Sequence, residues 1–222
     1  LGRVSTNAPH WLEADLAILM EPTSNRVEAG CQGTLRVLVV VTGRRAHSAR
    51  SWLGENAIHG AGEVLARLAA YEPRRVEIDG CEYREGLNAV GISGGVAGNV
   101  IPDEAMVHIN YRFAPSRSGA EAVEHLRTLF AGYDLTVVDL AEGARPGLDA
   151  PLAREFVAAV GGTPLPKYGW TDVARFSALG IPAVNFGPGD ASFAHADDER
   201  IPVADISGYE DALRRWLNGV HD

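Results

Sequence analysis

The chain has 222 residues, of which 46% are hydrophobic and 22% are charged, and its formal net charge is −9. This composition is typical of a globular protein of one large or two ordinary domains, and an acidic balance argues against nucleic acid as a partner. The longest apolar run, at residues 35–42, is far too short to cross a membrane. Cys31 and Cys81 are too isolated to indicate a disulfide or a zinc knot, which favours a reducing cytoplasm.

The first half of the chain contains strand-like and helix-like segments. Residues 16–19 are apolar and end at Glu21-Pro22-Thr23, and residues 35–42 are rich in β-branched side chains, so both segments are predicted to be strands. Apolar residues recur at helical spacing in residues 56–71. Residues 106–113 alternate strictly, which places Asn110 and Arg112 on one face of a strand. A further strand is predicted at residues 87–92.

The segment from residue 118 to residue 138 adds a helix and a strand to the predicted elements that precede it. Ser118 is a favourable N-cap for a helix that ends at Gly132, and residues 135–138 are predicted to be a strand. The order from residue 35 is then strand, helix, strand, strand, helix, strand, which is typical of a ferredoxin-like βαββαβ domain. We therefore predict such a domain at residues 33–139, inserted into an α/β domain formed by residues 1–32 and 140–222. The second part of that split domain is predicted to contain helices at residues 152–160, 172–179 and 206–220, and a buried strand at residues 181–186.

Two residues have the character of metal ligands. Glu21 follows an apolar strand, and His195 follows a strand and the glycine-containing turn at residues 186–190. A carboxylate and an imidazole are ligand types of hydrolytic zinc, and α/β proteins bind ligands at the carboxyl ends of strands. The alternatives are an ordinary turn residue and a surface histidine. A catalytic zinc needs three protein ligands, so either this site is mononuclear and weak or its other ligands precede Leu1.

Three further residues could contribute to a site. His47 lies in the basic segment at residues 43–50, where a neutral imidazole could donate a hydrogen bond to a developing oxyanion; an exposed loop histidine is the alternative. Arg112 and Arg175 could each bind a substrate carboxylate, because a guanidinium presents paired donors. Isolated arginines are usually partners in surface ion pairs, so that alternative also stays open.

Several segments taken together resemble one enzyme family. They are residues 21–23, 28–34, 43–50, 97–102, 110–113, 170–176 and 185–189. In their amino-acid sequences and in their order along the chain, these segments resemble the dinuclear-zinc deacylases and exopeptidases. This family includes acetylornithine deacetylase and the succinyl-diaminopimelate desuccinylases. The details are most similar to the desuccinylases, and the resemblance covers essentially the whole chain.

The resemblance implies a zinc-exopeptidase-like α/β catalytic domain with an inserted ferredoxin-like lid that forms a homodimer. It implies that Glu21 is the carboxylate ligand of one Zn²⁺ and His195 the imidazole ligand of the other, with Co²⁺ able to substitute. The lid histidine that crosses the dimer interface to stabilise the tetrahedral oxyanion matches His47. Asn99 matches a lid asparagine that reaches the active site of the partner.

The resemblance also implies a small acidic substrate. The positions that hold substrate carboxylates match Arg112, Thr171 and Arg175, and the backbone at Gly187 lines the site. The implied reaction is metal-dependent hydrolysis of an N-acyl amide. For the desuccinylases this is N-succinyl-LL-2,6-diaminopimelate, and an acetylated amino acid or a dipeptide is the alternative substrate.

The chain departs from the family pattern in one respect. Family members carry a His-x-Asp strand end, a bridging Asp and a Glu-Glu pair ahead of the segment that matches residue 1. Here no Glu-Glu pair occurs, and no His-x-Asp ends a predicted strand. The expectation is that this sequence is the C-terminal part of an enzyme and is inactive alone. A non-catalytic dimerisation module is the alternative.

Overall fold

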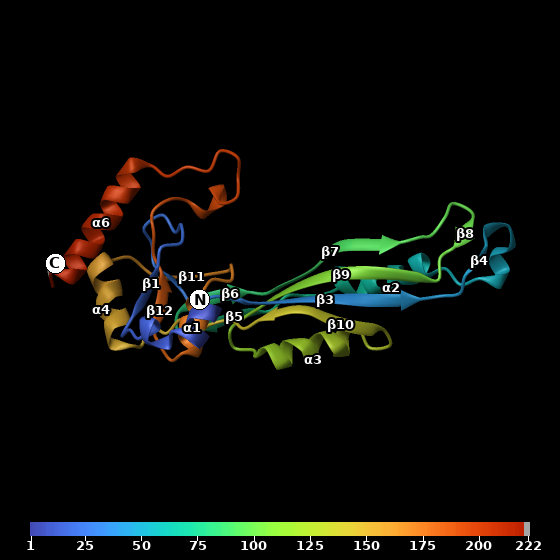
Figure 1. The fold of residues 1–222 in the computed structure, drawn as a ribbon, viewed down its shortest axis with the longest axis horizontal. Coiled ribbons are helices and arrows are strands. Elements are labelled where there is room, and N and C mark those ends of the chain that lie inside the picture. The colour runs from blue at the N-terminus through green and yellow to red at the C-terminus, as the bar shows by residue number, and fades with distance from the viewer. Residues whose placement is uncertain (220–222) are drawn as a thin grey trace. The chain divides into compact units, whose positions relative to one another are not determined.

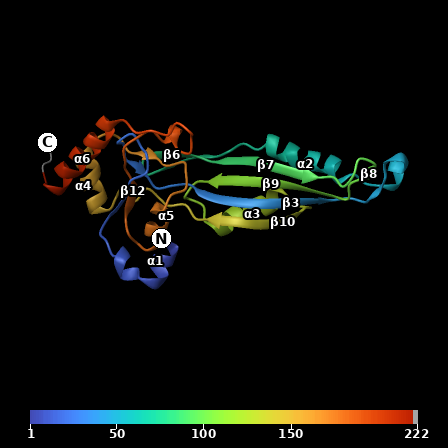
Figure 2. The same ribbon diagram turned by 45° about the horizontal axis from the view of Figure 1, so that its top comes forward.

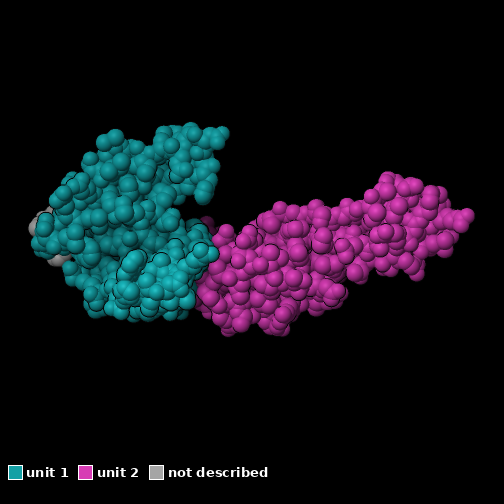
Figure 3. Space-filling model, in the orientation of Figure 1, with its two compact units in different colours: residues 1–32, 76–83, 143–222 teal, residues 33–75, 84–142 magenta. Residues whose placement is uncertain are grey.

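The computed structural model describes residues 1–219, which form two compact units (Figure 3). Unit 1 comprises residues 1–32, 76–83 and 143–222, and unit 2 comprises residues 33–75 and 84–142. Each unit has a hydrophobic core of its own. No helix within residues 1–219 combines the length and the apolar character that a membrane span requires.

Unit 2 is built on a four-stranded antiparallel sheet with the strand order β10-β3-β9-β7 (Figures 1 and 2). Along the chain its elements follow as β3, α2, β7, β9, α3 and β10. This confirms the predicted βαββαβ arrangement, which is a ferredoxin-like fold. The bounds are Gly33–Thr42 for β3, Ala57–Ala69 for α2, Gly86–Gly94 for β7, Glu104–Phe113 for β9, Gly119–Leu129 for α3 and Asp134–Ala141 for β10.

The alternation in β9 decides which face of the sheet is buried. Val107 and Ile109 are at most 1% exposed, whereas His108 between them is exposed. Because successive side chains of a strand point to opposite faces, the apolar set lies on one side of the sheet. There it joins a core that includes Val64 of α2 and Leu126 of α3.

Both helices of unit 2 begin at side-chain caps. The Oδ1 of Asn56 accepts a hydrogen bond from the N–H of Ile58 at 2.9 Å, and Ser118 forms a capping box with Glu121. The helix predicted at residues 56–71 is confirmed, although Ile58 and Leu65 of its apolar stripe are 42% and 39% exposed. Only one side of the helix packs on the sheet, so α2 presents a second apolar side to the surface.

A buried carboxylate lies beside the core of unit 2. The Glu85 side chain is fully buried and accepts hydrogen bonds from Arg74 Nη2 at 2.6 Å, the Tyr111 hydroxyl at 2.9 Å and the Ala114 N–H at 3.0 Å. Burial by itself would raise the pKa of Glu85, but these donors outweigh it and hold that pKa below its ordinary value. Arg117 donates in turn to the Tyr111 hydroxyl. The carboxylate therefore ties three separate segments of unit 2 together.

A second, two-stranded sheet lies beyond the end of β3 (Figure 1). In it β4 (Ala46–His47) pairs antiparallel with β8 (Val100–Ile101), and the 3₁₀ helix η2 (Ser48–Leu53) follows β4 directly. The basic segment at residues 43–50 therefore has a defined structure rather than that of a loose loop.

A hairpin that the sequence analysis missed interrupts the predicted inserted domain. Its strands β5 (Arg75–Ile78) and β6 (Cys81–Arg84) are joined by Asp79-Gly80, both at positive φ. An Asp-Gly pair between alternating residues is a strong hairpin signal. The Tyr83 hydroxyl donates to the carbonyl oxygen of Ala29 at 2.7 Å, and residues 76–83 consequently belong to unit 1. Unit 2 therefore differs from the predicted inserted domain at residues 33–139 in two ways: it lacks residues 76–83, and it extends to residue 142.

Unit 1 contains a small mixed sheet with the strand order β1-β12-β2-β11. Strand β12 pairs parallel with β1 and antiparallel with β2. Each of the four strands has only two or three residues, with the bounds Ala17–Leu19 for β1, Glu28–Ala29 for β2, Leu165–Pro166 for β11 and Ala183–Asn185 for β12.

Aromatic side chains form the core of unit 1. Phe156 contacts Phe186 and Trp216 with ring centroids 5.3 and 5.1 Å apart, and Phe186 contacts Tyr209 at 5.4 Å. Helices α4, α5 and α6 match the three predicted ones, whereas α1, η1 and η3 were not predicted; Val220 at the end of the last predicted helix lies outside the described residues. Their bounds are Gly2–Asn7 for α1, Pro9–Leu12 for η1, Pro151–Val160 for α4, Val173–Ala178 for α5, Ala191–Phe193 for η3 and Val203–Leu217 for α6.

Candidate active site

The carboxyl ends of β1 and β12 lie side by side, because the strands are parallel with Leu19 opposite Asn185. The N–H of Phe186 donates to the carbonyl oxygen of Leu19 at 2.9 Å, so the chain leaves both strands at the same edge. A Cβ atom at Gly187 would lie 2.4 Å from the carbonyl oxygen of Glu21, and only glycine allows this approach. The structure therefore brings Glu21 and Gly187 together.

Thr23, which the sequence analysis named only as part of a motif, holds this edge together. Its buried hydroxyl donates a hydrogen bond to the carbonyl oxygen of Gly187 at 3.3 Å. The same hydroxyl oxygen accepts a hydrogen bond from the backbone N–H of Gly187 at 3.1 Å. Asn185 at the end of β12 is fully buried, and its amide donates to the carbonyl oxygen of Glu28 at 3.2 Å. Thr23 is close to Glu21 in the sequence, and Asn185 is close to Gly187. This position at the end of a strand, beside a predicted site residue, could have identified both of them from the sequence.

His195 lies in the loop after η3 and is exposed. Its φ of 66° is uncommon for a residue other than glycine, and its backbone N–H donates to the Glu199 carboxylate at 3.3 Å. Residues 195–197 do have His-x-Asp spacing, but they lie in this loop and not at the end of a strand. Within residues 1–219, no hydrogen bond joins His195 to Glu21, so their convergence stays a prediction.

A metal centre is not complete in the part of the chain that the structure describes. Within residues 1–219, no three His, Cys, Asp or Glu side chains gather closely enough to hold a metal ion. Glu21 and His195 are donors of the right kind for zinc, but a catalytic zinc takes three protein ligands. These residues by themselves therefore do not fit a catalytic zinc ion.

Thr171 offers a buried polar atom in front of α5. The residue is 6% exposed, and its hydroxyl has no hydrogen-bond partner among the described residues. Buried polar groups rarely stay unpaired, so this hydroxyl is a candidate hydrogen-bonding group for a ligand. The Sγ atom of Cys31 lies 3.8 Å from the Thr171 carbonyl oxygen, and burial raises the pKa of this thiol. Cys31 and Cys81 are both buried and free, as the sequence predicted.

The two predicted carboxylate-binding arginines have different surroundings. Arg175 in unit 1 is exposed, pairs with Asp172 at 2.8 Å, and lies over the Trp170 ring at 5.4 Å. These contacts orient the guanidinium while half of the side chain stays accessible. Arg112 in unit 2 is half-buried on the face of β9 that is opposite to the core, across from Thr34 in β3.

His47 and Asn99 lie together in unit 2. His47 is paired with Val100 in the β4–β8 ladder, and the N–H of Ser48 donates to the Asn99 carbonyl oxygen at 2.9 Å. The Nδ1 atom of His47 accepts a hydrogen bond from the N–H of Ala49 at 3.1 Å. An imidazole that accepts at Nδ1 is neutral and carries its proton on Nε2. This exposed ring therefore presents an N–H donor that could stabilise an oxyanion.

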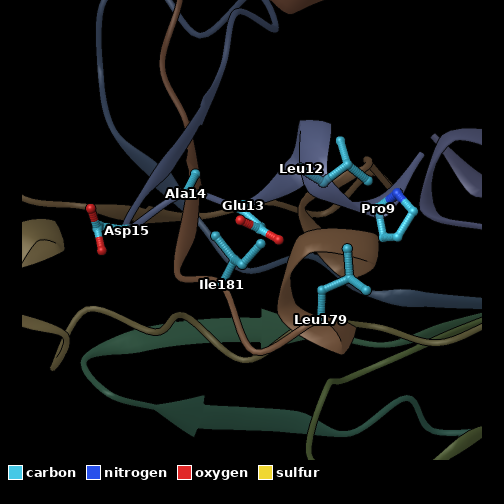
Figure 4. A pocket seen from close by; sticks show the side chains of 7 residues that line it. All are labelled: Pro9, Leu12, Glu13, Ala14, Asp15, Leu179 and Ile181. Carbon is cyan, nitrogen blue, oxygen red and sulfur yellow. The ribbon is translucent and has the colours of Figure 1, made fainter.

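A hollow of about 590 Å³ lies elsewhere in unit 1 (Figure 4). The side chains of Leu12, Leu179 and Ile181 contribute to its wall, together with the acidic Glu13 and Asp15. The eight predicted site residues are not among the described residues that line it. This hollow therefore adds nothing to the predicted chemistry.

Comparison with known proteins gives consistent matches. A family model described as a peptidase dimerisation domain matches residues 30–135. The chain is 62% identical over 221 residues to a putative succinyl-diaminopimelate desuccinylase of Mycobacterium tuberculosis, covering 99% of this chain and 62% of that protein. It is 50% identical to a succinyl-diaminopimelate desuccinylase of Corynebacterium glutamicum, covering 98% of this chain and 61% of that protein. This chain thus spans less than two thirds of the length of these curated relatives.

Solved structures share the fold at lower sequence identity. A tripeptidase from Staphylococcus aureus matches with a TM-score of 0.74 and 19% identity, covering 96% of this chain and 59% of that chain. An M20 family metallo-carboxypeptidase from Sulfolobus solfataricus matches with a TM-score of 0.71 and 17% identity, covering 97% of this chain and 65% of that chain.

Proposed function

We propose that this chain is part of an M20-family hydrolase that converts N-succinyl-LL-2,6-diaminopimelate to succinate and LL-diaminopimelate, as its similarity to the succinyl-diaminopimelate desuccinylases and its peptidase dimerisation domain support. This reaction serves the synthesis of diaminopimelate and lysine. The observation that carries the proposal is the 62% identity to the putative desuccinylase across 99% of this chain.

The proposal includes two bound Zn²⁺ ions, for which Co²⁺ can substitute. Such ions, when bound, would polarise the scissile carbonyl and lower the pKa of a water molecule. Glu21 and His195 are the ligands that this chain would contribute, one to each ion. Since a catalytic zinc takes three protein ligands, we place the remaining ligands and the general base in the part of the relatives that this chain does not span. The 222-residue chain alone is then inactive.

His47 is proposed to stabilise the tetrahedral oxyanion. The hydrogen bond from the Ala49 N–H to Nδ1 at 3.1 Å keeps the ring in the tautomer whose Nε2–H can donate. Such a donor is most effective when it is already oriented before charge develops on the carbonyl oxygen. Asn99, held at the same small sheet, is proposed to reach the active site of a partner subunit together with His47.

The remaining predicted residues are proposed to bind the substrate. Arg112 and Arg175 would hold its carboxylates, the unpaired Thr171 hydroxyl would donate to one of them, and the Gly187 backbone would line the site. Arg175 is already oriented by Asp172 and by the Trp170 ring, which lowers the entropic cost of binding. Binding by two positively charged side chains agrees with a substrate that carries several carboxylates.

A homodimer through unit 2 is supported by the family match and by the surface of that unit. Strand β7 is an edge strand of the sheet, and its Val90 and Ile92 side chains are 65% and 54% exposed. Ile58 and Leu65 on α2 extend the apolar surface. An unpaired edge with exposed apolar side chains is a template for a second copy. We place this dimer in the cytoplasm, where the buried thiols of Cys31 and Cys81 stay reduced.

The alternative function is deacylation of a related substrate. An acetylornithine deacetylase of Myxococcus xanthus is 30% identical over 95% of this chain and 60% of its own length, and both substrates carry carboxylates. A non-catalytic dimerisation module is a second alternative, motivated by the incomplete set of metal ligands among residues 1–219.

One experiment separates these functions. The intact protein, loaded with Zn²⁺ or Co²⁺, is assayed for the release of succinate from N-succinyl-LL-diaminopimelate and of acetate from N-acetylornithine. The proposal expects a much higher kcat/KM for the succinylated substrate. Activity on acetylornithine alone would transfer the protein to the deacetylases, and inactivity on both with normal dimerisation would support the non-catalytic module.

A further inference from the structure

The basic segment at residues 43–50 contains three arginines, and the structure gives partners to two of them. The Nε of Arg44 donates to the carbonyl oxygen of Leu53 at 2.8 Å. The Nε and Nη2 of Arg45 both donate to Asp103 Oδ1, at 3.0 and 2.8 Å. Both guanidinium groups therefore serve the structure of the segment itself.

Arg50 is different. Its side chain is exposed, and it makes no hydrogen bond or ion pair with any residue that the structure describes. It lies in η2, where its φ of −132° and ψ of 48° interrupt the helical conformation. The N-cap of η2 is His47, whose Nε2–H is free to donate. An uncommitted guanidinium and an oriented imidazole thus share one short element.

We infer that Arg50 is a specificity-determining residue that binds the free carboxylate of the succinyl group. This inference rests on the proposed function, in which His47 donates to the oxygen of the scissile carbonyl. In a succinyl amide, only two methylene groups separate that carbonyl from a second carboxylate. A residue that binds this carboxylate must therefore lie close to the residue that holds the carbonyl oxygen.

The chemistry of the side chain fits this ligand. A guanidinium binds a carboxylate through paired hydrogen bonds, and one that has no internal partner need not break an ion pair first. An acetyl group ends in a methyl group next to the scissile carbonyl and has no carboxylate for Arg50 to bind. Arg50 would thus favour succinylated over acetylated substrates, a distinction that Arg112 and Arg175 do not make if they hold the carboxylates of the amino acid part.

The test compares two acyl groups on one amine. The intact metal-loaded dimer and its Arg50→Gln variant are assayed with N-succinyl- and N-acetyl-LL-diaminopimelate. The ratio of kcat/KM for the succinyl over the acetyl substrate is expected to fall roughly 10–100-fold, as for the loss of hydrogen bonds to a charged group. Arg50→Lys should recover part of the ratio. Arg45→Gln is the matched control, because it removes a guanidinium from the same segment and should leave the ratio unchanged.

Several results would overturn the inference. An equal loss on both substrates in Arg50→Gln would show that Arg50 supports the segment and does not read the acyl group. Unchanged kcat/KM values on both substrates would remove Arg50 from the site. If the unsubstituted enzyme cleaves the acetyl compound but not the succinyl compound, the proposed function fails, and Arg50 then has no succinyl group to bind.

Discussion

Replacement of Glu85 by alanine tests whether the buried carboxylate organises unit 2. The side chain is fully buried and accepts hydrogen bonds from Arg74, Tyr111 and Ala114. Tyr111 and Ala114 are themselves fully buried, so without Glu85 the hydroxyl and the N–H lose an acceptor that water cannot easily replace. Arg74 is 43% exposed and can return to solvent at small cost.

The magnitude follows from these two donors. Each buried donor left unpaired costs about 1–3 kcal/mol, so the free energy of unfolding of unit 2 should fall by about 2–6 kcal/mol. The matched control is Arg36→Ala, which breaks an ion pair of 2.8 Å to Asp139 between side chains that are 60% and 41% exposed. That pair should be worth less than about 1 kcal/mol.

Amide hydrogen exchange in peptides from β9 measures the stability of unit 2 separately from that of unit 1. Urea unfolding followed by circular dichroism gives the stability of the whole chain. Both should show a much larger loss for Glu85→Ala than for Arg36→Ala. Equal effects of the two substitutions would refute the view that Glu85 is a structural anchor of this unit.

The pH dependence follows from the same contacts. The pKa of folded Glu85 lies below its ordinary value, which is about 4.3 in an unfolded chain. A lowered pKa stabilises the fold above the unfolded value, and this stabilisation is lost as the pH falls through the folded pKa. The stability difference between the unsubstituted chain and Glu85→Gln should therefore be constant near neutral pH and shrink below about pH 4.3.

Further substitutions test other parts of the structure. Gly187→Ala places a Cβ atom 2.4 Å from the Glu21 carbonyl oxygen, and it should lower the melting temperature through an overpacking cost of about 1–3 kcal/mol. The matched control is Gly62→Ala in α2, where a Cβ atom has nothing within 4 Å; this substitution should stabilise the fold by about 0.5–1 kcal/mol. Ser118→Ala removes the capping box of α3 and should cost about 0.5–2 kcal/mol in urea unfolding; no change would mean that the cap contributes nothing. His47→Leu in the intact enzyme should lower kcat by about 10²–10³ with a similar KM, and a change in KM alone would contradict an oxyanion role. If the proposed dimer forms at the β7 edge, Val90→Lys should convert it to a monomer in size-exclusion chromatography, and a dimer of unchanged elution would exclude that edge.

The predictions about unit 2 succeeded because its signals are local. Residues 106–113 alternate with the period of a strand, and the structure buries one half of that set in β9. Ser118 was predicted to be an N-cap, and its side chain accepts a hydrogen bond from the N–H of Glu121. The order of these elements along the chain is enough to indicate a ferredoxin-like fold, because few topologies accommodate it.

The sheet of unit 1 and the hairpin at residues 75–84 were harder to predict from the sequence. Strands of two or three residues, such as β2 and β11, are too short to show any period. The hairpin did carry an Asp-Gly turn signal, but its membership in unit 1 depends on contacts such as that of Tyr83 with Ala29. Local patterns cannot specify which distant segment receives such a hydrogen bond.

The candidate site shows the same division between local and distant information. The sequence by itself determined which residue types stand at the strand ends and in the basic segment, among them Glu21, His47 and Arg50. Only the tertiary structure decided that Thr23 bonds to Gly187, across 164 residues. It also decided that Arg44 and Arg45 have hydrogen-bond partners while Arg50 has none within residues 1–219. The physical reason is that secondary structure follows the short repeat of the backbone, whereas the partner of a polar group depends on how distant segments are packed together.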